Sequence, residues 1–207
     1  MKRSQKEKNL SWLNKLKNSP LASAYKATIL PRAQKKLELI APMLEAESKV
    51  LDIGCGNAGL SKLLMEKGHK VTCIDVVDNS FFPEVKPLVY DGRTFPFKEI
   101  TFDAAIFMTV LHHIPDDQHI DLLKQAMRVA NKVIVMEDIF THGLGQKVTH
   151  FTDSLVNLEF KGHPHSNRTN KAWKQLFDEA GLVVANTKHT KTLQYFRQVV
   201  YELHPRN

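Results

Sequence analysis

Two cysteines in 207 residues are too few for a disulfide framework or a cysteine-rich zinc site. The sequence also lacks the apolar run of about 18 residues that a membrane-spanning helix needs, and no short cleavable hydrophobic stretch stands at its start. We therefore expect a cytoplasmic protein without stable membrane insertion. Cys55 and Cys73 are expected to be small packing residues rather than nucleophiles.

The excess positive charge is confined to one end of the chain. Residues 1–49 contain eleven Lys or Arg and four Asp or Glu, whereas residues 50–207 contain eighteen of each sign, so the net charge of +7 belongs to the first segment. Apolar residues recur at helical spacing over 4–18 and over 21–44, with breaks or kinks expected near Pro31 and Pro42. The lysines predict either solvated helix faces or a surface for an anionic partner such as nucleic acid or a membrane surface.

Residues 50–56 form an apolar strand that runs directly into a glycine turn, and a helical pattern follows over 58–67. Glycines allow the sharp bend and the close approach of a ligand, and free N–H groups that open a helix favour a negatively charged group. The turn therefore predicts a small anionic or carboxylate-bearing cofactor.

Strands and helices alternate from residue 48 onward, which predicts a parallel sheet with helices on both faces. Asp116 and Asp117 are expected to cap the helix at 117–130. The predicted strands are 48–53, 70–75, 86–90, 102–108, 132–138 and a closing antiparallel hairpin of about 182–189 and 194–203. The predicted helices are 58–67, a short one near 79–84, 117–130, 144–158 and 170–180.

Carboxylates follow two of these strands. Asp75 ends the second strand 19 residues after Gly56, where an acid can accept both hydroxyls of a ribose. Asp91 follows the third strand. Because the carboxyl ends of parallel strands meet at one edge of a sheet, we expect these acids to lie beside the glycine turn.

The series Leu-Asp-Ile-Gly-Cys-Gly, Ile-Asp, Tyr-Asp-Gly with Phe-Pro-Phe, Phe-Asp-Ala-Ala and Val-Leu-His-His-Ile stands in this order over residues 48–138. It resembles the class I S-adenosylmethionine-dependent methyltransferases. The resemblance implies a Rossmann-like α/β fold with a seven-stranded, mostly parallel sheet and an antiparallel C-terminal strand. It further implies N-terminal helices over 1–47 that cover the site of a single methyltransferase domain, 48–207.

The same resemblance assigns roles to individual residues. The glycine turn would receive the methionine part of S-adenosylmethionine, with Asp52 near its amino group. Asp75 would bind the ribose hydroxyls and Asp91 the adenine amino group. The residues implied in cofactor binding are Asp52, Gly54, Cys55, Gly56, Asp75, Val76, Asp91, Gly92, Thr109 and Val110.

Residues after strands four and five are the candidates for chemistry, because a doubly wound sheet places its site outside those strand ends. That position selects His112, His113, Glu137 and Asp138. His113 is the preferred general base, although a His-His pair can also serve as a hydrogen-bonded scaffold. Asp138 and two histidines of a polar loop, His163 and His165, are expected to bind the acceptor. No histidine pair has the spacing of four that favours a metal site.

The stretch after strand four carries neither an Asn-Pro-Pro-Tyr-like motif nor a Pro-Cys pair. These absences count against methylation of exocyclic amines and of cytosine carbon 5. By analogy with the family, the acceptor is expected to be a small molecule methylated at oxygen or nitrogen. Two alternatives remain: an RNA or protein methyltransferase that uses the basic N-terminal segment, and a non-catalytic protein that binds the cofactor.

Overall fold

The computed structural model describes residues 15–139, 168–193 and 196–206. Most of the predicted first helix, the predicted helix at 144–158, and His163 and His165 lie outside the described residues. Within the part of the chain that is described, no helix is long and apolar enough to cross a membrane.

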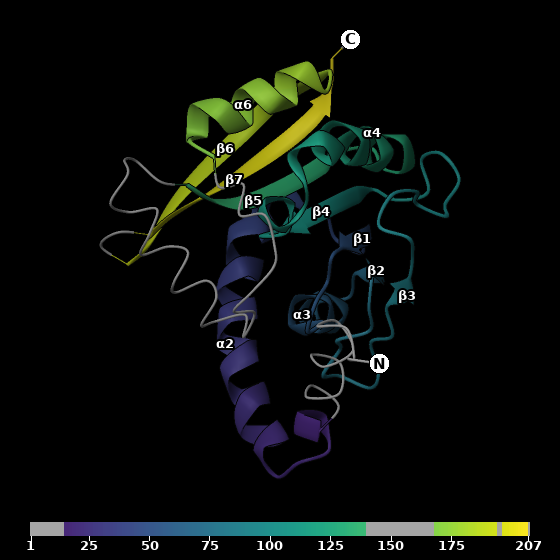
Figure 1. Ribbon diagram of the computed structural model, residues 1–207, viewed down its shortest axis with the longest axis vertical. Coiled ribbons are helices and arrows are strands. Elements are labelled where there is room, and N and C mark those ends of the chain that lie inside the picture. Colours follow the sequence, from purple (N-terminus) through teal and green to yellow (C-terminus); the bar gives the residue numbers. More distant parts are fainter. Residues whose placement is uncertain (1–14, 140–167, 194–195, 207) are drawn as a thin grey trace, which may run out of the picture.

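Seven strands form one sheet in the order β3-β2-β1-β4-β5-β7-β6 (Figure 1). The five strands from β3 to β5 are parallel, and β7 runs antiparallel to both of its neighbours. The predicted seven-stranded sheet and its C-terminal hairpin are therefore confirmed. The strands are β1 Lys49–Ile53, β2 Lys70–Asp75, β3 Leu88–Val89, β4 Ala104–Met108, β5 Val133–Ile139, β6 Leu182–Leu193 and β7 Phe196–Pro205.

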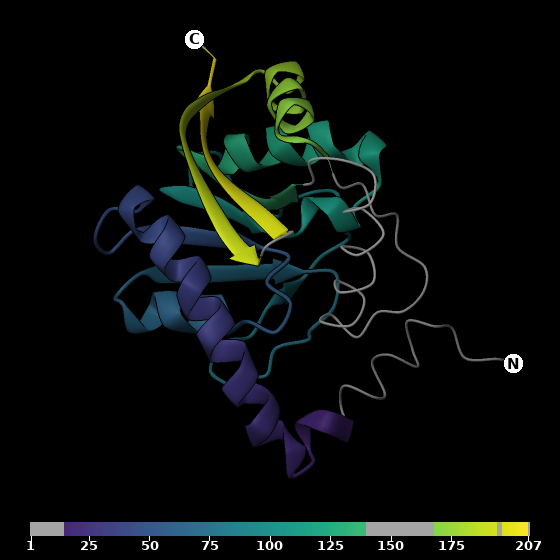
Figure 2. The same ribbon diagram turned by 90° about the vertical axis from the view of Figure 1, so that its left-hand side faces the viewer.

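Helices cover both faces of this sheet. Helix α2 (Leu21–Ile40) and helix α3 (Gly59–Glu66) lie on one face, and α4 (His119–Val129) and α6 (Asn170–Glu179) lie on the other, as Figures 1 and 2 show. Two apolar clusters result, one between the sheet and α2/α3 and one between the sheet and α4/α6. The large fully buried side chains of the second cluster include Trp173 and Tyr201.

Helix α2 differs in detail from its prediction. Pro31 lies inside the helix without ending it, and a 3-10 turn, η1 (Ala41–Met43), follows at Pro42. Its buried stripe consists of Ile29, Ala33, Leu37 and Ile40, at the helical spacing that the sequence predicts. The helix packs this stripe on α3 and the sheet, so the N-terminal segment contributes to the main core.

Two local predictions are wrong. Residues 79–84 form no helix, and two local causes explain this. The hydroxyl oxygen of Ser80 accepts the backbone N–H of Phe82, and Pro83 disfavours a helical conformation in the residue before it. Asp116 and Asp117 do not cap α4. They form the 3-10 turn η3 (Asp116–Gln118), and the helix begins after Gln118 without a side-chain cap.

Candidate functional site

Strand register brings three chain segments to one edge of the sheet. Ile53, the last residue of β1, pairs with Ile74 of β2 and with Phe107 of β4. The residues that follow these positions are the glycine turn, Asp75 and the loop after β4, respectively. They lie side by side at the carboxyl ends of the strands, as the sequence predicts.

The glycine turn needs its glycines for two different reasons. Gly54 has φ +70°, and a Cβ there would lie 2.6 Å from Cγ1 of Val110, so the turn touches the loop after β4 directly. Gly56 has φ +53°, but a Cβ there would meet nothing within 4 Å. Gly56 therefore borders open space, through which a ligand can approach the backbone. Ala58, the residue before the first residue of α3, takes the left-handed conformation at φ 62° although it is not a glycine.

The backbone donors of this turn are largely engaged within the protein. Gly54 and Cys55 donate to the Ile74 carbonyl, Ala58 donates to the Cys55 carbonyl, and Gly59 donates to the Asn57 side chain. The N–H of Gly56 donates to the Asp75 carboxylate at 2.9 Å. The N–H groups of these five residues therefore have acceptors within the protein, which suits a ligand without a pyrophosphate.

Asp52 lies beneath the turn and is 3% exposed. Burial raises its pKa to about 6, although a 2.5 Å hydrogen bond from the Ser61 hydroxyl and the charge of Lys36 both oppose that rise. Cys55 stands in the turn itself, between Gly54 and Gly56. A hydrogen bond with the Cys73 thiol and burial raise the pKa of Cys55 well above its ordinary value, in keeping with a packing role.

Asp75 ends β2 beside the turn, in the place predicted for a ribose ligand. Oδ2 accepts the Gly56 N–H, and Oδ1 accepts the Val77 N–H at 3.4 Å. Burial raises the pKa of this carboxyl, while the bonds from these backbone donors lower it. The carboxylate is thus fixed in orientation and partly exposed at the sheet edge.

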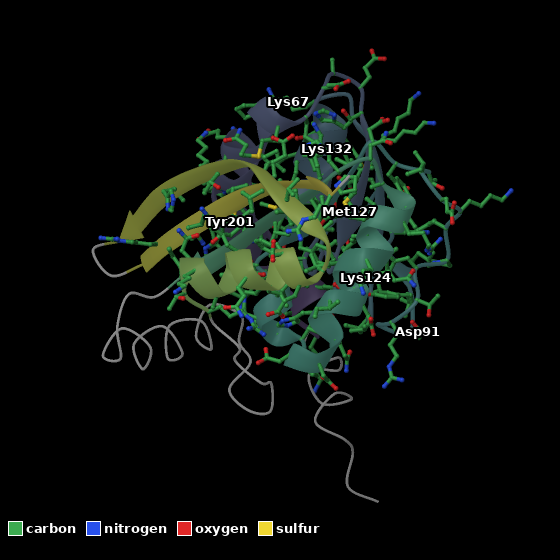
Figure 3. The ribbon with its side chains drawn as sticks, turned by 90° about the horizontal axis from the view of Figure 1, so that it is seen from above. Lys67, Asp91, Lys124, Met127, Lys132 and Tyr201 are labelled. Atoms are coloured by element: carbon green, nitrogen blue, oxygen red, sulfur yellow. The ribbon has the colours of Figure 1, made fainter. Side chains whose placement is uncertain are left out.

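Asp91 follows β3, one strand further out than Asp75. It is exposed, its Oδ1 accepts the N–H groups of Arg93 and Thr94 at 2.8 Å, and these bonds lower its pKa. Figure 3 shows it at the rim, on the opposite side of the molecule from Tyr201. Gly92, at φ +80°, packs closely on Val76, where a Cβ would lie 3.1 Å from Cγ1. This contact joins the ends of β2 and β3.

Thr109 opens the loop after β4 in a left-handed conformation, with φ 65°. That conformation is strained for a β-branched residue and persists only when neighbours fix it. The Thr109 N–H donates to the Met136 carbonyl at 2.7 Å. From the other side, the Lys36 ammonium of α2 donates to the Met108 carbonyl at 2.9 Å and to Oγ1 of Thr109 at 2.8 Å.

Glu137 of β5 fixes the rest of this loop and is fully buried. Its Oε1 accepts the N–H groups of Val110 (3.1 Å) and Leu111 (2.8 Å), and its Oε2 lies 2.6 Å from Nδ1 of His112. His113 follows in the 3-10 turn η2 (Leu111–His113), half-buried, with its ring centroid 4.0 Å from that of His112. The buried carboxylate therefore anchors the histidine pair.

The structure assigns roles that sequence reasoning missed. Glu137 was selected for chemistry by its position, but it is a buried anchor of the loop. Lys36 was not selected at all. One feature of the sequence could have identified it: Lys36 comes three residues after Ala33 and four before Ile40, so it lies on the buried side of the helix.

Asp138, predicted to bind the acceptor, is half-buried near the end of β5. Among the described residues, no group of three or more metal-ligating side chains is placed to hold an ion.

The chain resembles several known proteins. A family model described as a methyltransferase domain matches residues 25–187. An uncharacterized methyltransferase of Staphylococcus carnosus is 31% identical over 103 residues, or 46% of this chain and 49% of that protein. A ubiquinone biosynthesis O-methyltransferase of Idiomarina loihiensis is 30% identical over 83 residues, or 35% of this chain and 34% of that protein. The chain thus spans about half or less of these curated relatives.

Among solved structures, a SAM-dependent methyltransferase from Methanosarcina mazei superposes with a TM-score of 0.66 at 18% identity. The alignment covers 81% of this chain and 97% of that one. At this identity the likeness establishes the fold.

Proposed function

This chain belongs to the methyltransferase-domain family and uses S-adenosylmethionine, and on that premise we propose that it methylates an oxygen or nitrogen of a small-molecule acceptor. The observation that carries the proposal is the position of His113. Its loop is anchored by Glu137 and touches the glycine turn through Val110. A titratable side chain therefore lies on the same loop as the predicted cofactor contacts.

The cofactor, when bound, supplies a methyl carbon that its sulfonium has already activated. The protein has to align the acceptor and take up its proton. His113 is suited to receive the proton of an acceptor hydroxyl or amine, since an imidazole titrates near neutral pH. Glu137 keeps the His112 ring in place, and the His113 ring lies against it.

The cofactor contacts proposed here follow the geometry of the sheet edge. Asp75 would bind the ribose, because its carboxylate lies beside the open space at Gly56. Val76 and Gly92 would line the adenine site, with the Asp91 carboxylate at its rim. Thr109 and Val110 would border the methionine part, together with the turn Gly54–Gly56.

The acceptor is proposed to bind residues at and beyond the end of β5. Asp138 at the end of β5 would contact the acceptor, and His163 and His165 remain proposals on residues outside those described. The name of the Idiomarina relative, a ubiquinone biosynthesis O-methyltransferase, supports a small-molecule acceptor with a hydroxyl group.

We propose that the N-terminal segment 1–47 covers the site. Its described part contacts the segment after β2, with the Tyr25 and Phe81 rings 4.7 Å apart and the Lys17 ammonium 3.4 Å from the Asp78 carbonyl. Ile29 closes over the start of α3, where a Cβ on Gly59 would lie 2.4 Å from its Cγ2. These contacts account for the segment without a nucleic-acid partner.

The proposal is tested by transfer of a labelled methyl group from S-adenosylmethionine to a panel of phenols, catechols and small amines. His113→Ala should lower kcat by roughly 10²-fold or more on the best acceptor, which is the usual contribution of a general base. Its affinity for S-adenosylhomocysteine should stay within about twofold, because no cofactor contact is assigned to the imidazole.

The matched control is His189→Ala, an exposed histidine on the edge strand β6, which should leave kcat unchanged. An unchanged kcat in His113→Ala would remove His113 as the base. Transfer to RNA that falls steeply with added salt would favour the nucleic-acid alternative. Cofactor binding without transfer to any acceptor would favour a non-catalytic protein.

A further inference from the structure

We propose that Lys36 binds the carboxylate at the amino-acid end of the cofactor, so that helix α2 supplies a charged ligand to the cofactor site. The inference rests on S-adenosylmethionine as the cofactor. It adds a residue from a helix that lies outside the glycine turn and outside the loops that follow the strands.

The first observation is where the ammonium lies. Lys36 extends from the packed side of α2 to the carboxyl end of β4 and donates to the Met108 carbonyl and to Oγ1 of Thr109. Since Ile53 pairs with Phe107, Met108 is level with Gly54 on the neighbouring strand. The ammonium is therefore placed beside the glycine turn, where the methionine part of the cofactor is proposed to bind.

The second observation is that backbone donors of the glycine turn already have acceptors. The N–H groups of Gly54, Cys55, Gly56, Ala58 and Gly59 all donate within the protein, and the Gly56 donor already serves a carboxylate, that of Asp75. A ligand carboxylate entering this turn would find these donors engaged, and a nearby cation would be needed to balance its charge. Lys36 supplies a positive charge near the turn, and this charge acts on Asp52.

The chemistry of the side chain fits the role. An ammonium has three donors on a flexible stem, so it can turn towards a carboxylate while it keeps the Met108 carbonyl. Asp52 and Lys36 together place one negative and one positive group near the turn. That pair is complementary to the ammonium and carboxylate of an amino acid.

The test compares two nucleosides by calorimetric titration. S-adenosylhomocysteine carries the amino-acid end, and 5′-methylthioadenosine has the same adenosine and sulfur without it. Lys36→Met should weaken binding of S-adenosylhomocysteine roughly 10- to 100-fold, as expected for loss of a charged hydrogen bond. It should change binding of 5′-methylthioadenosine less than about threefold, and Lys36→Arg should recover part of the loss.

The matched control is Lys35→Met, which removes an exposed charge from the next position of the same helix and should change neither affinity. Equal weakening of both nucleosides by Lys36→Met would overturn the inference, because Lys36 would then act only by holding Thr109. Unchanged affinities would overturn it as well. Wild-type protein that binds neither nucleoside would instead overturn the proposed function, and this inference with it.

Discussion

Asp52 is an ionisable group that the fold buries at a cost. Its pKa of about 6, raised by burial from 3.8, means that the folded protein binds this proton more tightly than the unfolded chain does. Stability therefore falls as pH rises from about 4 to 6, and the cost is fully present above pH 6. We therefore expect that a carboxyl in this place serves to bind a cationic group and not to stabilise the fold.

We predict that Asp52→Asn stabilises the protein at pH 8 by up to about 3 kcal/mol, since a shift of one pKa unit corresponds to about 1.4 kcal/mol. Asparagine can still accept the Ser61 hydroxyl. The gain should shrink to well under half near pH 4.5, where the wild-type carboxyl is protonated in the folded protein. Urea unfolding at both pH values measures it. An equal gain at both would contradict the assigned pKa.

The same substitution should weaken S-adenosylmethionine binding, because the neutral amide no longer balances the ammonium of its amino-acid end. In wild-type protein, affinity should fall as pH is lowered through about 6. Calorimetric titration over pH 5–8 measures both effects, and a pH-independent affinity would argue against Asp52 as the acid concerned.

At the scale of residues, the two glycines of the turn are needed for different reasons: Gly54 for packing against Val110, and Gly56 for the approach of a ligand. Gly54→Ala should destabilise the fold by more than 2 kcal/mol, because its methyl would overlap Val110 in addition to the backbone strain of about 1 kcal/mol. Gly56→Ala should cost only that strain in stability. It should nevertheless abolish cofactor binding, because its methyl would occupy the open space through which the cofactor is proposed to approach. Thermal unfolding and titration of both variants measure this contrast. Intact cofactor affinity in Gly56→Ala would place the ligand elsewhere.

At the scale of elements, the loop after β4 is held from two sides by charged side chains, one half-buried and one buried. Lys36 of α2 fixes its left-handed first residue, and Glu137 of β5 fixes the next turn and His112. Helix α2 and strand β5 thus determine where Thr109, Val110 and His113 lie. The loop links the predicted cofactor contacts to the proposed base.

Glu137→Gln should test this linkage. Its carbonyl can still accept the Val110 and Leu111 N–H groups, but its amide would donate towards Nδ1 of His112 and force the other tautomer on that ring. We expect a loss of roughly 1–3 kcal/mol in stability and a fall in kcat with little change in KM for the cofactor. Nitrogen chemical shifts of the His112 ring report the tautomer. Unchanged shifts would show that the carboxylate does not set it.

At the scale of the whole molecule, the N-terminal segment and the sheet share one core. Ile29, Leu37, Ile40 and Met43 are buried against α3 and the sheet. Each such side chain contributes about 1.5–3 kcal/mol, and their sum is comparable to the entire stability of a domain of this size. We therefore expect the boundary near residue 47 to divide the sequence but not the fold.

We predict from this that the fragment 48–207 does not fold on its own. Its circular dichroism should lack a cooperative thermal transition, and it should bind a hydrophobic dye that the full chain does not bind. A fragment with a cooperative transition close to that of the full chain would show that α2 is only a cover over the site.

Much of this molecule follows from local sequence. The apolar runs that end in Gly54, Asp75 and Met108 predict the central strands, and parallel strands must bring their ends together. The irregular segment around Pro83 was missed because side-chain hydrogen bonds compete with a helix there. The bond between Lys36 and Met108 joins residues 72 positions apart, so only the packed position of α2 reveals it.

We propose above all that the sheet edge between the glycine turn and Asp75 binds the cofactor. Calorimetric titration of the full chain with S-adenosylhomocysteine tests it most directly, with Asp75→Ala as the variant and Lys67→Ala, an exposed residue just beyond α3, as the control. We predict one site, a loss of roughly 5- to 150-fold in Asp75→Ala because charge-assisted bonds to the ribose disappear, and no change in the control. No binding by the wild type, or equal affinity in Asp75→Ala, would contradict the account.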